Sequence, residues 1–154
     1  MKLLIEQIKF IEAQVLDVET QTKQILDKIN SPITTIPGIA SVTAAVILGE
    51  IGDINRFSSP SKLAAYAGID ATVNQSGEYK SQNGKMSKRG SPYLRKALFQ
   101  VANVAVLHDP TLSAFYHKKR SEGKHHLTAV GAVARKLCNI IHAVLKNNSP
   151  YQIQ

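Results

Sequence analysis

The first 30 residues carry a strict apolar repeat, and no other feature of the sequence constrains the fold as much. The repeat positions are spaced alternately by four and three residues, and only the threonine is not apolar: Leu4, Ile8, Ile11, Val15, Val18, Thr22, Ile25 and Ile29. Glu, Gln, Lys and Asp are common between them, and no Gly or Pro occurs before Pro32. This pattern predicts one helix of about eight turns whose apolar stripe needs a partner.

Three structural roles are possible for this apolar stripe. It can pack on another part of the same chain as a helical hairpin, join copies of the chain as a coiled coil, or form the end of a linker in a larger protein. The regular spacing leads us to expect a homo-oligomer assembled through residues 4–29. We divide the chain into a coiled-coil helix (1–31), a compact helical domain (32–150) and a tail (151–154).

The rest of the chain contains residues that start and stop helices. Ser41 is expected to cap a helix after Pro37-Gly38, and a last helix is expected from about Leu127 to Asn147. Between the helices, residues 69–91 are polar and predict a long loop or short hairpin, with a turn at Asn83-Gly84. The fold is therefore expected to be mainly α. Three pairs place a capping side chain before a proline at the first helical position: Ser59-Pro60, Ser91-Pro92 and Asp109-Pro110.

The charge of the chain is concentrated in its second half. The sequence has 19 Lys and Arg against 11 Asp and Glu, and residues 76–154 hold 13 of the basic and three of the acidic side chains. A one-sided basic field favours a polyanion, most often nucleic acid, although a solvated basic face is the simpler alternative.

The composition and the apolar segments of the chain indicate its cellular location. The single cysteine, Cys138, cannot form an intramolecular disulfide, and Glu6 and Lys9 interrupt any apolar core of a signal peptide. The longest apolar stretch, residues 39–48, is about half of what a spanning helix needs. We therefore expect a cytoplasmic protein with no membrane partner.

The segment around Pro37-Gly38 resembles the helix-hairpin-helix motif of DNA repair and recombination proteins. In that motif, backbone N–H groups at a helix N-terminus contact a phosphate, and Gly38, Ile39 and Ala40 hold those positions here. A plain helical turn is the alternative interpretation.

Several segments taken in order carry a stronger resemblance. They are IPGIASVTAAVILGEIGDINRF, SPSKLAAYAGID, NQSGEYKSQNGKMSKRGSPYLRKAL and the closing helices, over roughly residues 33–150. This series resembles the C-terminal domain of bacterial insertion-sequence transposases of the IS110 and IS1111 type, the DEDD recombinases. The family also places a long coiled-coil helix before that domain.

The resemblance implies DNA strand exchange by a mobile element, with DNA and a structured guide RNA as partners. It also implies a preceding ribonuclease-H-like domain whose acidic residues bind Mg²⁺. The acidic residues of the first helix are interpreted as its solvated face and not as Mg²⁺ ligands. We therefore expect no cofactor in this chain. The chain is then expected to be a C-terminal portion or a truncated reading frame, and by itself not a competent transposase. The alternative functions are a non-catalytic helix-hairpin-helix nucleic-acid-binding protein and an oligomerisation module.

In this family a loop serine attacks a DNA phosphate and forms a phosphoserine link. Ser76, in Asn74-Gln75-Ser76-Gly77, best matches that position, whereas Ser91 before Pro92 reads as a helix cap. Outside the resemblance, Ser76 would be read as a turn residue. The cations of the loop and of the following helix are expected to contact nucleic acid: Lys80, Lys85, Lys88, Arg89, Arg95 and Lys96.

Two smaller groups of residues have simpler interpretations. His117–Arg120 and Lys124–His126 form a second basic cluster, which either binds a polyanion or stabilises a helix C-terminus. Cys138 and His142 share a helical face, but zinc needs further ligands that the spacing does not supply. We therefore predict no metal site.

Overall fold

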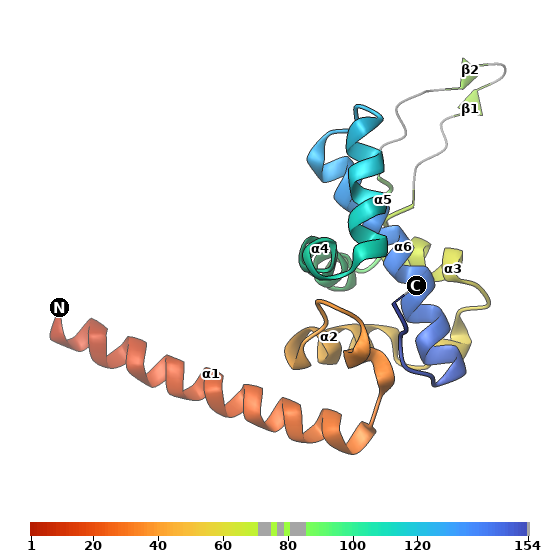
Figure 1. Ribbon diagram of the computed structural model, residues 1–154. Coiled ribbons are helices and arrows are strands. Elements are labelled where there is room, and N and C mark those ends of the chain that lie inside the picture. Colours follow the sequence, from red (N-terminus) through yellow and green to blue (C-terminus); the bar gives the residue numbers. More distant parts are fainter. Residues whose placement is uncertain (71–74, 77–78, 81–85, 154) are drawn as a thin grey trace.

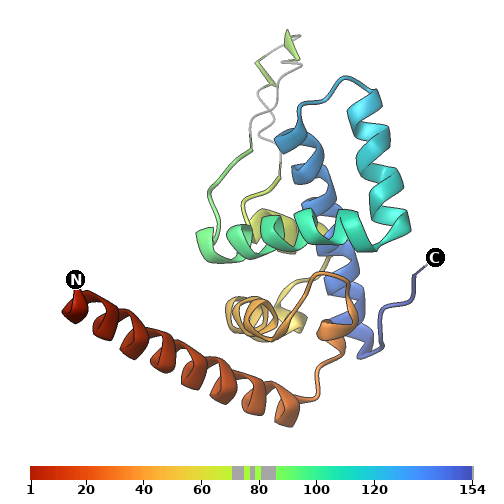
Figure 2. The same ribbon diagram turned by 60° about the vertical axis from the view of Figure 1, so that its left-hand side comes forward.

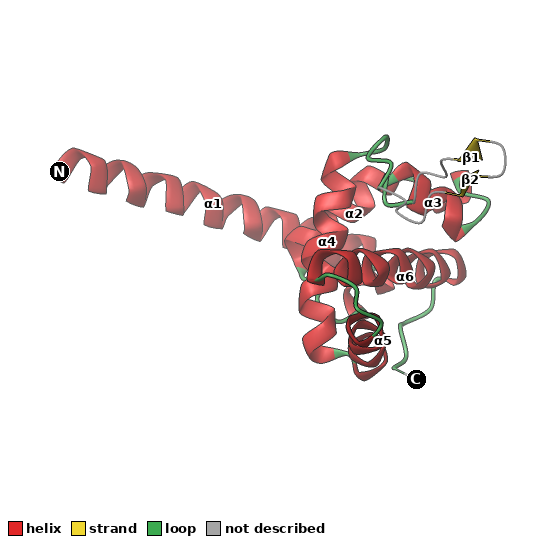
Figure 3. Cartoon of the chain, turned by 90° about the horizontal axis from the view of Figure 1, so that it is seen from above, coloured by secondary structure: helices red, strands yellow, loops and turns green. Residues whose placement is uncertain are grey.

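The structure, a computed structural model, describes residues 1–70, 75–76, 79–80 and 86–153, and these are mainly helical, as the sequence predicts (Figure 3). Two 3-10 turns, η1 (Pro32–Thr35) and η2 (Ile54–Arg56), connect helices, and two short strands, β1 (Gln75–Ser76) and β2 (Tyr79–Lys80), pair antiparallel. The α-helices of the described chain are α1 (Lys2–Ile29), α2 (Ser41–Ile51), α3 (Pro60–Tyr66), α4 (Pro92–His108), α5 (Pro110–Ser121) and α6 (His126–Asn147).

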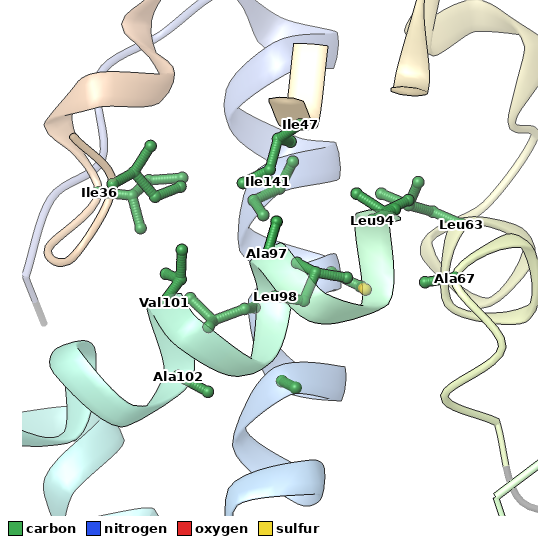
Figure 4. Close-up of a cluster of buried hydrophobic side chains, with 14 of the residues drawn as sticks. Ile36, Ile47, Leu63, Ala67, Leu94, Ala97, Leu98, Val101, Ala102 and Ile141 are labelled. Atoms are coloured by element: carbon green, nitrogen blue, oxygen red, sulfur yellow. The ribbon is translucent and has the colours of Figure 1, made fainter. Parts of the chain in front are cut away.

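Helix α6 runs through the middle of the helical domain and contacts α3, α4 and α5 (Figures 1 and 2). Its apolar face is buried because these helices cover it, and α4 in turn contacts α2. By length and composition α6 is also the one described helix that could cross a membrane, but half of its apolar window is buried in the fold. Figure 4 shows core side chains from α2, α3, α4 and α6: Ile47, Leu63, Leu98, Val101 and Ile141.

Local capping chemistry sets where most of these helices begin. The predicted caps are confirmed at α3, α4 and α5, where Ser59, Ser91 and Asp109 accept hydrogen bonds from backbone N–H groups three residues on. The cap predicted at Ser41 is wrong. Ala40 holds the extended N-cap position, so Ser41 is already the first helical residue of α2.

Helix α1 extends away from the helical domain (Figure 1) and leaves its apolar stripe largely exposed. A hollow between α1 and α2 is lined by Val15, Val18 and Val42, yet Val15 and Val18 are 50% and 61% exposed. Only Leu26, near the end of α1, is buried. Contact with α2 therefore does not cover the stripe.

The C-terminal tail folds back on the domain through Tyr151. Its hydroxyl donates to Oδ2 of Asp109 at 2.6 Å, and its N–H donates to Oγ1 of Thr35 at 2.8 Å. Asp109 is 1% exposed, and its other oxygen accepts from the N–H of Leu112. Both carboxylate oxygens are thus satisfied, as a buried acid requires.

Alkaline pH is expected to weaken the fold. Burial and the hydrogen bond to Asp109 raise the pKa of Tyr151 from 10.0 to about 12, and burial raises the pKa of the Cys138 thiol from 9.0 to about 12. The unfolded chain therefore loses these protons first, so their stabilising contribution is full below pH 9 and is lost as the pH rises toward about 12. Urea unfolding followed by helical circular dichroism at successive pH values measures this decline.

Tyr151→Phe is the matched variant for this prediction. It removes one of the two titrating groups, so the free energy of unfolding should fall less steeply over the same pH range. An identical slope in the variant and the parent chain would contradict the role given to Tyr151.

Candidate functional site

The polar loop leaves the helical domain through two hydrogen-bonded segments, residues 66–70 and 87–91, which we call the neck. The donor and acceptor positions move in opposite directions along the chain, so the two segments run antiparallel. The neck therefore fixes where the loop begins and ends. Three backbone N–H groups donate to carbonyl oxygens across it: Ser91 to Tyr66 at 2.7 Å, Lys88 to Gly68 at 3.0 Å and Ser87 to Asp70 at 3.0 Å.

Glycine is required at the closest approach of the two segments. A Cβ on Gly90 would lie 1.8 Å from the carbonyl oxygen of Tyr66, far inside van der Waals contact. On the opposite segment, Gly68 has φ +67°, a left-handed conformation that glycine adopts without steric cost. Gly90, which follows Lys88 and Arg89, thus serves packing of the neck.

Two of the serines near the loop have structural partners. The Ser87 hydroxyl donates to Oδ1 of Asp70, which ties the two segments of the neck together. The Ser91 hydroxyl donates to Oε2 of Glu50 at 2.6 Å and accepts from the N–H of Leu94 at 3.0 Å, which caps α4. Both hydroxyls are therefore engaged in holding the neck and the start of α4.

Exposed cations surround the junction of the neck with α4. Lys88 and Arg89 are exposed just before the helix, and Lys96 is exposed in its second turn; we call these three residues the neck cations. Lys88 has φ +54°, a conformation uncommon for residues other than glycine. Cations beside a helix N-terminus, where the helix dipole is positive, form an arrangement suited to a phosphate.

Arg95 lies differently from the other predicted cations. Its Nη1 donates to the carbonyl oxygen of Ala67 at 3.1 Å, and the side chain is half-buried. This contact joins α4 to the end of α3 next to the neck. Arg95 therefore stabilises the contact between α4 and α3, at a position where the sequence predicts phosphate contact.

The predicted nucleophile lies in the short ladder at the far end of the loop. Ser76 is in β1 and pairs with Tyr79, and Gln75 pairs with Lys80. β1 and β2 lie away from the helices (Figures 1 and 2). Lys85 and the turn predicted at Asn83-Gly84 lie outside the described residues. Ser76 and the neck thus lie at opposite ends of the loop.

The Pro37-Gly38 turn packs against α4. Gly38 has φ +89°, and a Cβ there would lie 3.0 Å from the carbonyl oxygen of Val101. Ile39 is buried, and its N–H donates to the carbonyl oxygen of Ile36 at 3.1 Å, whereas Ala40 is exposed. Gly38 and Ile39 therefore have packing roles, and phosphate contact at this turn stays a prediction.

The described residues do not fit a magnesium site of their own. They contain no group of three His, Cys, Asp or Glu side chains that could hold a metal ion. Two carboxylates at the neck, Glu50 and Asp70, each accept a hydrogen bond from a serine hydroxyl. Cys138 is buried, and Nε2 of His142 lies 3.0 Å from the carbonyl oxygen of Phe57.

Sequence reasoning missed the residues that support the neck. Glu50 is the one charged residue of α2, a pattern that could have drawn attention to it. The sequence around Arg56 gives less indication of a role. In the structure its guanidinium lies 4.8 Å from the ring centre of Tyr66 and 4.9 Å from that of Phe57. These contacts hold the end of α3, from which the neck starts.

Similar proteins share this part of the chain. The chain is 31% identical over 138 residues to the insertion element IS110 uncharacterized 43.6 kDa protein of Streptomyces coelicolor. This alignment covers 88% of the chain and 34% of that protein. The chain is 34% identical over 120 residues to the insertion element IS900 uncharacterized 42 kDa protein of Mycobacterium paratuberculosis (77% and 30%). It is also 34% identical over 122 residues to the pilin gene-inverting protein of Moraxella bovis (79% and 38%).

The chain spans about a third of the length of these relatives. The sequence profile of the transposase IS116/IS110/IS902 family matches residues 30–117, which include the neck, both strands, α4 and most of α5. Because this match covers more than half of the chain, the protein belongs to the transposase IS116/IS110/IS902 family.

Proposed function

We propose that this chain is the DNA-binding and strand-exchange domain of an insertion-sequence transposase, with Ser76 as its nucleophile. The observation that carries the proposal is the family match over residues 30–117, because it includes the whole loop and its neck. DNA, and a structured guide RNA, are the proposed partners. The helical domain at 32–150 would hold the loop, and the helix at 1–31 would join copies of the chain.

The chemistry proposed for the loop is a phosphoryl transfer. The Ser76 oxygen forms a bond to a DNA phosphorus while the bond from that phosphorus to one deoxyribose oxygen breaks. The proton of the serine hydroxyl passes to a general base, and the departing deoxyribose oxygen takes up a proton. Lys80, which lies opposite Gln75 in the ladder that holds Ser76, would supply positive charge to offset the charge that gathers on the phosphate.

Trapping the covalent intermediate tests the proposal directly. A recombination-competent form of the protein is incubated with DNA carrying the element's end, denatured, and digested for mass spectrometry. We expect a nucleotide attached to the peptide that contains Ser76. A nucleotide attached only to another residue would refute the assignment.

Phosphate contact by the neck cations is expected to give a strong salt dependence. Replacing Lys88, Arg89 and Lys96 by glutamine should weaken duplex DNA binding and lower the slope of log affinity against log salt by about 0.9 per cation. Fluorescence anisotropy over a series of salt concentrations measures both quantities.

Helix α1 supplies the matched control for that experiment. Lys9, Lys23 and Lys28 are also exposed, and their replacement by glutamine likewise removes three positive charges. This variant should keep the parent slope. An equal loss of slope in both variants would mean that binding responds to net charge alone.

The exposed stripe of α1 is proposed to pair with a second copy of the chain. Replacing Ile11 and Val15 by lysine places charge in that seam and should convert a dimer to a monomer, with at least about a hundredfold weaker association. Sedimentation equilibrium measures the mass. Leu16→Lys is the control, because Leu16 is exposed on the same helix outside the repeat, and a dimer that survives the double substitution would contradict the coiled coil.

A further inference from the structure

The end of the helical domain formed by α5 and α6 contains a groove that the proposed strand exchange does not use. The groove has a volume of about 540 Å³, within the range of small-molecule sites. Its apolar side comes from α4 and α6, and Leu107 there is 79% exposed. We call it the α5–α6 groove, and its lining includes Val106, Leu107, Tyr116, His117, His126 and Val130.

Aromatic rings form the other side of the groove in a fixed arrangement. The Tyr116 ring lies edge-on to the imidazoles of His117 and His126, with ring centres 5.3 and 5.8 Å apart. The Tyr116 hydroxyl and Nδ1 of His126 are 2.8 Å apart, within hydrogen-bond distance. This bond joins α5 to α6 and holds the tyrosine ring in place before any ligand binds.

Exposed cations follow Tyr116 and His117 in the last turn of α5 and in the turn between α5 and α6. Lys118, Arg120 and Lys124 are exposed. The acid of the turn, Glu122, pairs with Lys119 at 2.8 Å and so leaves the other three cations uncompensated within the turn. Arg120 also donates to the carbonyl oxygen of Lys124 at 2.8 Å, which sets the path of the turn.

We propose that the α5–α6 groove binds an unpaired nucleotide of a single-stranded nucleic acid. The tyrosine ring and the apolar wall suit a base, and the adjacent cations suit its phosphates, which is the combination that single-strand-binding surfaces use. A duplex keeps its bases stacked inside, so it would meet the cations without filling the groove. The same charge argues against a basic or neutral peptide as the occupant.

The groove and the neck adjoin opposite ends of α4, with Val106 and Leu107 of the groove near the C-terminus and Ser91 of the neck at the N-terminus. They are separated by roughly 25 Å along the helix, a distance that several extended nucleotides can span. The two strands β1 and β2 and the turn between α5 and α6 lie on the same side of α4 (Figures 1 and 2). Where the loop returns to the domain, Met86 packs beside α6, with its Cε 3.6 Å from the place where a Cβ on Gly131 would be. The proposal goes beyond strand exchange because the groove requires neither Ser76 nor the neck cations.

Binding by the whole chain to labelled oligo(dT), oligo(U) and a DNA duplex of equal length tests the proposal. Tyr116→Leu keeps an apolar side chain but removes the aromatic face, and it should weaken single-strand binding about tenfold while duplex binding stays within about twofold. The ratio of oligo(dT) to oligo(U) affinity then distinguishes DNA from RNA as the natural ligand. Unchanged single-strand affinity, or an equal loss for the duplex, would overturn the proposal.

A second measurement uses the unaltered chain and does not depend on how the variant folds. Oligo(dT) that carries photoreactive iodouracil is crosslinked to the chain, and the attached peptides are identified by mass spectrometry. Crosslinks at Tyr116, His117 or His126 support the groove, and crosslinks confined to residues 86–96 overturn it. Because glutamine at Lys88, Arg89 and Lys96 should leave the groove crosslinks in place, failure at the groove is distinguishable from failure at the neck.

Discussion

Replacing Ser76 with alanine is expected to abolish strand transfer by a recombination-competent form of the protein while leaving its affinity for DNA nearly unchanged. The substitution removes the atom that would bond to phosphorus, and loss of a nucleophile lowers rates by at least about 10³-fold. Affinity comes mainly from phosphate contacts, so the dissociation constant should stay within about twofold of the parent value. Recombination of a marked element and anisotropy with the same DNA measure the two quantities.

The other serines of the loop and neck provide controls with distinct expected results. Ser87→Ala loses the bond to Asp70 and Ser91→Ala loses both the bond to Glu50 and the cap of α4, so each should lower stability by about 1–2 kcal/mol and retain strand transfer. Ser81 lies outside the described residues, and Ser81→Ala should retain activity. Retained recombination in Ser76→Ala, or its loss in Ser81→Ala alone, would move the nucleophile elsewhere.

The helices of this chain could be predicted because their signals are local. A capping side chain acts on an N–H group three residues away, so Ser59, Ser91 and Asp109 identify helix starts without knowledge of the rest of the fold. The repeat in residues 1–30 likewise predicts α1. Ser41 shows the limit of such reasoning, because the extended backbone at Ala40 starts the helix one residue earlier.

The neck could not be predicted because its contacts join distant parts of the chain. Ser91 bonds to Glu50 across 41 residues, and Arg95 bonds to Ala67 across 28. A basic residue before or after a helix start has the same sequence signal whether it contacts a phosphate or a carbonyl oxygen of its own chain. Gly38 is a similar case, since glycine serves close packing on α4 as well as it would serve close approach to DNA.

Gly90→Ala is expected to be the most destabilising single substitution in the neck. The new methyl group would lie 1.8 Å from the Tyr66 carbonyl oxygen and 2.8 Å from the Gly68 nitrogen, both of which are backbone atoms that cannot rotate away. The two segments must separate, so the hydrogen bonds from Ser91 to Tyr66 and from Lys88 to Gly68 are lost. We expect a loss of about 3–5 kcal/mol in the free energy of unfolding, measured by urea denaturation.

Gly49→Ala is the matched control for Gly90→Ala, because a Cβ at Gly49 meets no atom within 4 Å. Gly49 lies inside α2, where alanine is the better helix former, so this substitution should stabilise the chain by up to about 1 kcal/mol. If only the neck opens in Gly90→Ala, amide hydrogen exchange will rise at residues 87–91 while the core amides of α6 stay protected. A stability within about 0.5 kcal/mol of the parent chain, with unchanged exchange at 87–91, would show that the two segments are not in contact.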